Sequence, residues 1–112
     1  MTTAQHIPTR PLRAAQSITV TLDGARYRVD LDWNARIGRW FLSLFGASGS
    51  AIVRSKALVL GSDLLRQARH SEACPRGLLI VRDMQDQDAE ASLDSLGVRH
   101  RLYFVPLSEV GL

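Results

Sequence analysis

Residues 18–33, ITVTLDGARYRVDLDW, carry the pattern that decides the fold. Apolar and polar residues alternate on both sides of the dipeptide Asp23-Gly24. Alternation with a period of two is typical of half-buried strands, and an Asp-Gly pair between two such runs indicates a tight hairpin turn. The sequence therefore predicts a β-hairpin with one apolar and one charged face. The apolar face consists of Ile18, Val20, Leu22, Tyr27, Val29, Leu31 and Trp33.

A third strand is predicted over residues 39–45, after a turn at residues 34–38. Its first face consists of Trp40, Leu42 and Leu44, and its second of Phe41, Ser43 and Phe45. We expect the first face to share a core with the hairpin. Because the second face is also largely apolar, either the strand is central and covered on both sides, which we favour, or this face meets a partner.

The remaining predicted elements are short. Residues 51–54 and 56–60 form two strands or one bent strand, and further strands cover residues 77–82 and 99–105. Ser62 or Asp63 can cap a short helix from Leu64 to about His70. The polar stretch over residues 84–94 reads as an exposed loop. The predicted fold is mainly β, a small antiparallel β-barrel or sandwich of six to seven strands with one short helix.

The length of 112 residues suits one folded domain. Residues 1–15 contain Pro8 and Pro11 and show no periodicity, so we expect a flexible N-terminal arm that a partner orders. Residues 16–106 form the predicted β-rich domain, and residues 107–112 a C-terminal tail. Met1–Ala15 lacks an apolar stretch, so we expect no secretory signal, and no apolar run approaches the roughly 20 residues of a membrane-spanning helix.

The composition combines 46% apolar with 22% charged residues, which excludes a disordered chain. The net charge is +3, from 14 basic and 11 acidic residues. The arginines are dispersed and often adjoin Asp or Glu, whereas a nucleic-acid-binding protein gathers its basic residues on one face. This argues against nucleic acid as a partner. Arginine also suits protein interfaces, because it pairs bidentately and covers apolar surface with its stem.

Patterns that could support catalysis or metal binding are incomplete. Cys74 is the single cysteine, so neither a disulfide scaffold nor a thiolate zinc site can form within the chain. His70 lies four residues from Cys74, but no glycine-rich nucleophile turn surrounds the thiol. The acidic loop that begins at Asp83 lacks the glycine and the spacing of a calcium loop. We therefore expect no enzymatic activity, metal, cofactor or small-molecule substrate.

Protein interfaces are the remaining candidates. In the arm, we expect arginines to pair with neighbouring carboxylates and aliphatic side chains to cover apolar surface; these residues are Ile7, Arg10, Leu12 and Arg13. A basic edge flanks the two hairpin turns and consists of Arg26, Arg28, Arg36 and Arg39. In a head-to-tail oligomer this edge could meet Asp86 and Asp88 of the next subunit, while Phe41 and Phe45 supply apolar contact.

Five segments together resemble a known family. They are residues 18–33, WNARIGRW at 33–40, VLGSDLL at 59–65, GLLIV at 77–81 and RHRLYFVP at 99–106. Their order is similar to that of the cyanophage-type baseplate plug proteins over about residues 17–106, and the second and last segments are the most specific. The resemblance implies a non-enzymatic virion protein that plugs or adapts the central hub or tube of a contractile tail.

The same resemblance implies certain partners and a location. The partners would be other baseplate, hub or tail-tube proteins, with the chain as a homo-oligomer in the assembly. It would be made in the host cytoplasm and reside in the virion, without membrane contact. The alternative is a generic β-rich adaptor or a carbohydrate-contacting module, for which Trp33 and Trp40 would be exposed stacking platforms. Buried tryptophans favour the structural role, and exposed ones favour the ligand-binding role.

Overall fold

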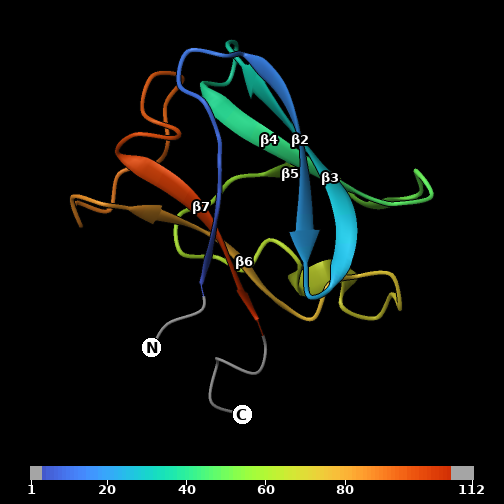
Figure 1. The fold of residues 1–112 in the computed structure, drawn as a ribbon. Helices are drawn as coiled ribbons and strands as arrows, with labels where there is room; N and C mark the ends of the chain where they lie inside the picture. Colours follow the sequence, from blue (N-terminus) through green and yellow to red (C-terminus); the bar gives the residue numbers. More distant parts are fainter. Residues whose placement is uncertain (1–3, 107–112) are drawn as a thin grey trace.

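Two antiparallel sheets make up the fold in a computed structural model that describes residues 4–106 (Figure 1). The four-stranded sheet has the order β2-β3-β4-β5 and the three-stranded sheet the order β1-β7-β6. The sheets pack face to face and do not close into a barrel, so the predicted mainly β fold is confirmed as a sandwich. The predicted tail at residues 107–112 lies outside the described residues.

The predicted hairpin is confirmed as strands β2 (Ala15–Leu22) and β3 (Ala25–Asn34). Leu22 pairs with Ala25, which leaves Asp23 and Gly24 as a two-residue turn. Both turn residues have positive φ, 52° and 80°. This turn conformation matches the right-handed twist of paired strands, and Asp-Gly adopts it at low cost.

Strand β4 (Arg39–Gly46) pairs with β3 and places Trp33 opposite Trp40. Its other neighbour is β5 (Ala51–Ala57), where the sequence left open one bent strand or two. The structure has one strand with register shifts between Leu42 and Phe45 of its partner. Ser55 has a φ of 46°, which is the local distortion expected of a β-bulge.

The three-stranded sheet contains β1 (Gln5–Ile7), β6 (Gly77–Asp83) and β7 (His100–Pro106). The expectation of an arm without structure of its own is wrong for residues 5–7, because these pair with Leu102–Phe104 of β7. Ile7 has no exposed surface and belongs to the chain's own core, so it is not available to another chain. Pairing with a distant strand supplies the order that the local sequence does not predict.

The predicted helix over residues 64–70 is shorter than expected, a single 3-10 turn, η1 (Arg66–Ala68). Its N–H groups donate to the carbonyl oxygen three residues earlier, as Ala68 N does to Leu65 O at 3.0 Å. So short a segment does not overcome the cost of nucleating an α-helix. The three side chains expected to face inward are nevertheless buried: Leu64, Leu65 and Ala68. Within residues 4–106, no helix has the length and apolar character needed to cross a membrane.

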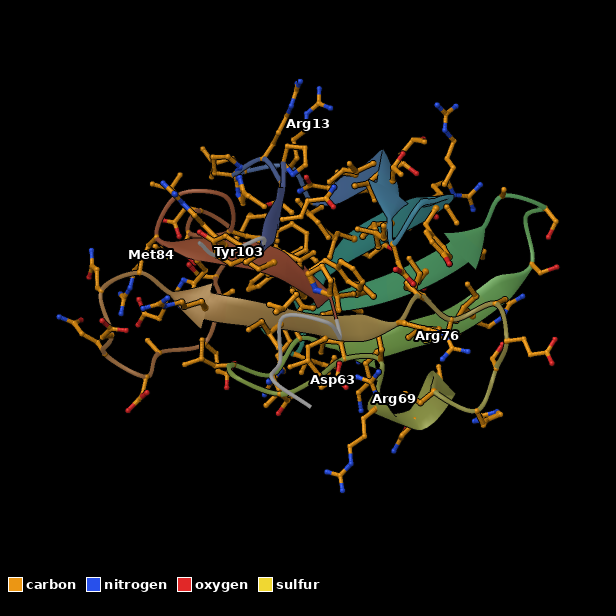
Figure 2. The ribbon with its side chains drawn as sticks, turned by 60° about the horizontal axis from the view of Figure 1, so that its bottom comes forward. Arg13, Asp63, Arg69, Arg76, Met84 and Tyr103 are labelled. Atoms are coloured by element: carbon orange, nitrogen blue, oxygen red, sulfur yellow. The ribbon has the colours of Figure 1, made fainter. Side chains whose placement is uncertain are left out.

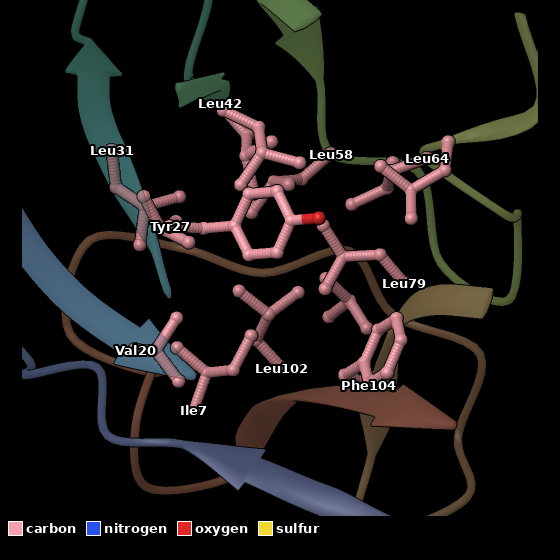
Figure 3. Close-up of a cluster of buried hydrophobic side chains, with 14 of the residues drawn as sticks. Ile7, Val20, Tyr27, Leu31, Leu42, Leu58, Leu64, Leu79, Leu102 and Phe104 are labelled. Carbon is pink, nitrogen blue, oxygen red and sulfur yellow. The ribbon is translucent and has the colours of Figure 1, made fainter. Parts of the chain in front are cut away.

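The core lies between the two sheets, and Figure 3 shows side chains of both meeting around Tyr27. The predicted inner face is confirmed. Its fully buried members include Val29, Leu31, Trp40, Leu42 and Leu44. Each such aliphatic side chain contributes roughly 1.5–3 kcal/mol by leaving water. Two aromatic side chains of the core also place their polar atoms in hydrogen bonds, since the Tyr27 hydroxyl donates to Ala73 O at 3.0 Å and Trp40 Nε1 donates to Ser92 O at 2.8 Å.

Candidate protein-interaction surface

The acidic loop after β6 is organised by a buried carboxylate, that of Asp83. Arg99 donates to it through Nε and Nη2, both at 2.9 Å, and the backbone N–H groups of Gln85 and Gln87 donate at 2.9 and 3.1 Å. The bonds to Arg99 hold the pKa of Asp83 far below its ordinary value. Sequence reasoning placed Asp83 in a solvated loop and missed this role, because only the fold brings Arg99 beside it.

His100 is also buried, at the start of β7. Its Nδ1 lies 2.8 Å from Ser95 Oγ, and its Nε2 lies 2.5 Å from Ala89 O. Ser95 Oγ in turn accepts from Ser92 N at 2.7 Å. A serine beside a histidine can form a nucleophile pair. Here the ring is 1% exposed and both of its nitrogens are engaged, so the contact fastens the loop to β7.

The Cys74–His70 pair considered as a nucleophile is not assembled. Cys74 is buried and His70 is exposed. The thiol contacts Pro75 O at 3.6 Å, and burial raises the pKa of Cys74, which keeps it protonated at neutral pH. Within residues 4–106, no group of three His, Cys, Asp or Glu side chains is placed to hold a metal ion.

The two tryptophans are not exposed platforms. Trp40 is 1% exposed, and Trp33 packs against the core with part of its surface in solvent. Their rings meet edge to face, with centroids 5.5 Å apart and an interplanar angle of 62°. An edge-to-face pair of this kind stabilises the sandwich. Of the two alternatives weighed from the sequence, this arrangement favours the structural role over a sugar-binding face.

The expected basic edge is not one surface. Arg26 and Arg28 lie near the start of β3, whereas Arg36 follows its end and Arg39 pairs with its last residue, Asn34, roughly 20–26 Å away at the usual rise per strand residue. Two of the four are already engaged within the chain. Arg28 pairs with Asp30 at 3.1 Å and lies 4.3 Å from the centre of the Phe45 ring. Arg39 donates to Leu58 O at 2.9 Å and has Glu90 at 3.8 Å.

The second face of β4 is half-buried and has no second sheet over it, so the favoured expectation of a strand covered on both sides is wrong. The sandwich consists of two sheets whose inner faces pack against each other. Within residues 4–106, no third layer is therefore present to cover the outer face of β4. Phe41 borders an open groove of about 530 Å³ on this outer face. The groove is lined by Asp32, Trp33, Asn34, Ala35, Arg36, Phe41, Ser43 and Ser55. Asp86 and Asp88 are exposed on the separate loop after β6.

The rest of the arm leads from β1 into β2, and beyond the buried Thr9 it runs along the surface. Arg10, Leu12 and Arg13 are exposed there, with Leu12 71% accessible. Figure 2 shows Arg13 extending away from the body, on the side opposite Asp63 and Arg69. Those two form an ion pair, and Arg69 also donates to Gly77 O at 2.7 Å. Arg69 is therefore paired with groups of its own chain, whereas Arg10 and Arg13 of the arm extend into solvent.

The described chain is thus a small β-sandwich with loops held by internal hydrogen bonds and with exposed arginines at one end. The chain belongs to the family described as "Cyanophage baseplate Pam3 plug gp18", whose model matches residues 4–108. No curated protein matched the chain. Membership assigns a structural role in a phage baseplate, a location in the virion tail and contact with other baseplate proteins. It agrees with the family named from the sequence segments.

Proposed function

We propose that this chain plugs or adapts the central hub or tube of a contractile tail, without enzymatic activity, through protein–protein contacts. The observation that carries the proposal is the family match over residues 4–108, which includes every strand of the sandwich. The same fold therefore serves in both the family and this chain, and its surface has to meet neighbouring baseplate proteins.

The internal fastening of the loops supports a plugging role. The longest connections between strands run from β5 to β6 and from β6 to β7. Asp63 holds the first, because its Oδ1 accepts from Leu65 N at 3.1 Å and from Leu79 N at 3.2 Å. Asp83 holds the second through Arg99. A protein that closes a channel under load benefits from loops that keep one shape, since ordering them on assembly would cost conformational entropy.

Synthesis in the host cytoplasm and homo-oligomer formation in the assembly belong to the same proposal. The head-to-tail contact expected from the sequence would use Arg26 toward Asp86 and Asp88, because the charges of Arg28 and Arg39 are occupied within the chain and Arg36 lies at the other end of the sheet. Each exposed pair of this kind adds only about 0–1 kcal/mol. Apolar contact through Phe45, which pairs with Arg28 near the same end of the sheet, would then supply most of the affinity.

Electron cryomicroscopy of intact tails tests the proposed function. We expect the sandwich to fit density on the tail axis within the central baseplate. An amber variant of the gene should yield particles that lack this density, while the sheath keeps its wild-type reconstruction as the internal control. A sandwich located at the baseplate rim, or absent from purified virions, would contradict the proposal.

A further inference from the structure

Two turns lie side by side at one end of the sandwich (Figure 1). One joins β1 to β2 and the other joins β3 to β4. Trp33 N, near the end of β3, donates to Ala14 O, just before β2, with an N–O distance of 2.7 Å. We call the exposed part of these turns the basic tip, and define it as residues 10–13 and 36–37.

Each turn of the basic tip presents one aliphatic side chain to solvent. Leu12 is 71% exposed and Ile37 is 61% exposed, the two highest values among the exposed large apolar side chains within residues 4–106. Leu12 also has a φ of 64°, a left-handed conformation that is unfavourable for residues with a side chain. The fold thus places a bulky apolar group in a costly conformation where the chain's own core gains little from it.

Hydrogen bonds hold both turns in shape. The amide of Gln16 bridges the first, because its Oε1 accepts from Arg10 N at 2.8 Å and its Nε2 donates to the carbonyl oxygens of Arg10 and Arg13 at 2.9 and 3.2 Å. Leu12 N donates to Leu93 O at 2.9 Å. In the second turn Asn34 Oδ1 accepts from the N–H groups of residues 36 and 37. A surface fixed before binding loses less entropy when it binds.

The arginine side chains of the basic tip are not paired within the described part of the chain. Arg10, Arg13 and Arg36 are exposed, and their guanidinium groups have no ion pair or hydrogen bond to residues 4–106. Arg69 and Arg99, by contrast, each pair with a carboxylate of the same chain. Three free guanidinium groups around two aliphatic side chains are complementary to an apolar depression with carboxylates at its rim.

We propose that the basic tip is the contact through which this chain docks onto an acidic, apolar-centred surface of a different baseplate protein. This inference rests on the proposed function and names the chemistry of one partner. A second copy is disfavoured as the occupant, because two tips meeting face to face would bring six guanidinium groups together, and in the head-to-tail contact proposed above the acidic loop of a second copy meets Arg26 instead. The aliphatic side chains supply the affinity, and the arginines set the orientation.

The substitution Leu12→Gly separates docking from folding. Glycine removes the apolar contact and adopts a positive φ freely, so the isolated variant should melt at or above the wild-type temperature. We combine it with Arg13→Glu and measure incorporation into tails in competition with wild-type chain, by quantitative mass spectrometry. We expect at least about a tenfold loss of incorporation. Arg66→Glu, which changes an exposed arginine of η1 outside the basic tip, is the matched control and should incorporate normally.

A photo-crosslinking amino acid at position 12 in assembled virions identifies the partner's chemistry. We expect a crosslink to a peptide that contains Asp or Glu and comes from another baseplate protein. A crosslink to a second copy of this chain, to DNA or to a peptide without carboxylates would overturn the inference, as would no crosslink or unchanged incorporation of the double variant. If the wild-type chain still lies on the tail axis, any of these results overturns only the docking role of the basic tip, and the proposed function stands.

Discussion

Asp83 and Arg99 form a two-pronged ion pair where β6 ends and β7 is about to begin. Arg99 Nε lies 2.9 Å from Asp83 Oδ1, and Arg99 Nη2 lies 2.9 Å from Asp83 Oδ2. The carboxylate also accepts from backbone N–H groups of the intervening loop. One buried charge therefore fixes both ends of the connection, with Arg99 as its counter-ion.

Acid should weaken the fold through this pair. The pKa of Asp83 is lowered in the folded state, so its contribution to stability is present above its unfolded pKa, about 3.9, and is lost as the pH falls toward the folded value. Denaturant unfolding should show wild type more stable than Asp83→Asn at pH 7, with the difference shrinking below about pH 4. Asp86→Asn, an exposed control on the same loop, should change stability little. A pH-independent difference would refute the assignment.

The two tryptophans should differ in their effect on stability. Trp40→Ala removes a fully buried ring and a hydrogen bond to Ser92 O, so we expect a loss of about 3–5 kcal/mol in the free energy of unfolding. Trp33→Ala removes a ring that is only partly buried and should cost less. Urea unfolding of the two variants checks the order. Equal losses, or a larger loss for Trp33→Ala, would contradict the described packing.

Gly77, the first residue of β6, has no space for a side chain. A Cβ there would lie 2.5 Å from both Phe104 Cζ and Val105 O. We expect Gly77→Ala to destabilise the fold by about 1–3 kcal/mol through overpacking. Gly46 ends β4, and a Cβ there would meet its nearest atom, Ile52 Cδ1, at 3.8 Å, so Gly46→Ala is the matched control. Thermal melts that rank the two variants the other way would disprove this.

Local patterns made part of this structure predictable. The hairpin over residues 18–33 follows from alternation and one Asp-Gly pair, because both act within a few residues. The burial of Asp83 depends on Arg99, and the order of β1 depends on β7, so neither has a signature near it in sequence. The adjacency of the two turns at the basic tip has the same origin. From the sequence, Leu12 could be named only as one of several interface candidates. The conformation of its turn depends on hydrogen bonds to Gln16 and Leu93, which local sequence does not predict.

The sequence alone predicts an arm whose amides exchange rapidly until assembly, and the structure reverses this expectation for β1. His6 and Ile7 pair with Tyr103 and Leu102 of β7, so backbone amides in residues 5–7 that donate to β7 should be protected from hydrogen exchange in the isolated protein. Ile7→Ala should remove that protection and cost about 2–5 kcal/mol, because the side chain is fully buried.

His6→Ala, on the exposed side of the same strand, is the control and should leave the exchange pattern near that of wild type. Hydrogen exchange followed by mass spectrometry of N-terminal peptides measures both variants. Rapid exchange over residues 5–7 in the isolated wild-type chain would show that β1 forms only on assembly. In that case Ile7 would return to the set of residues available to a neighbouring protein, beside Leu12 of the basic tip.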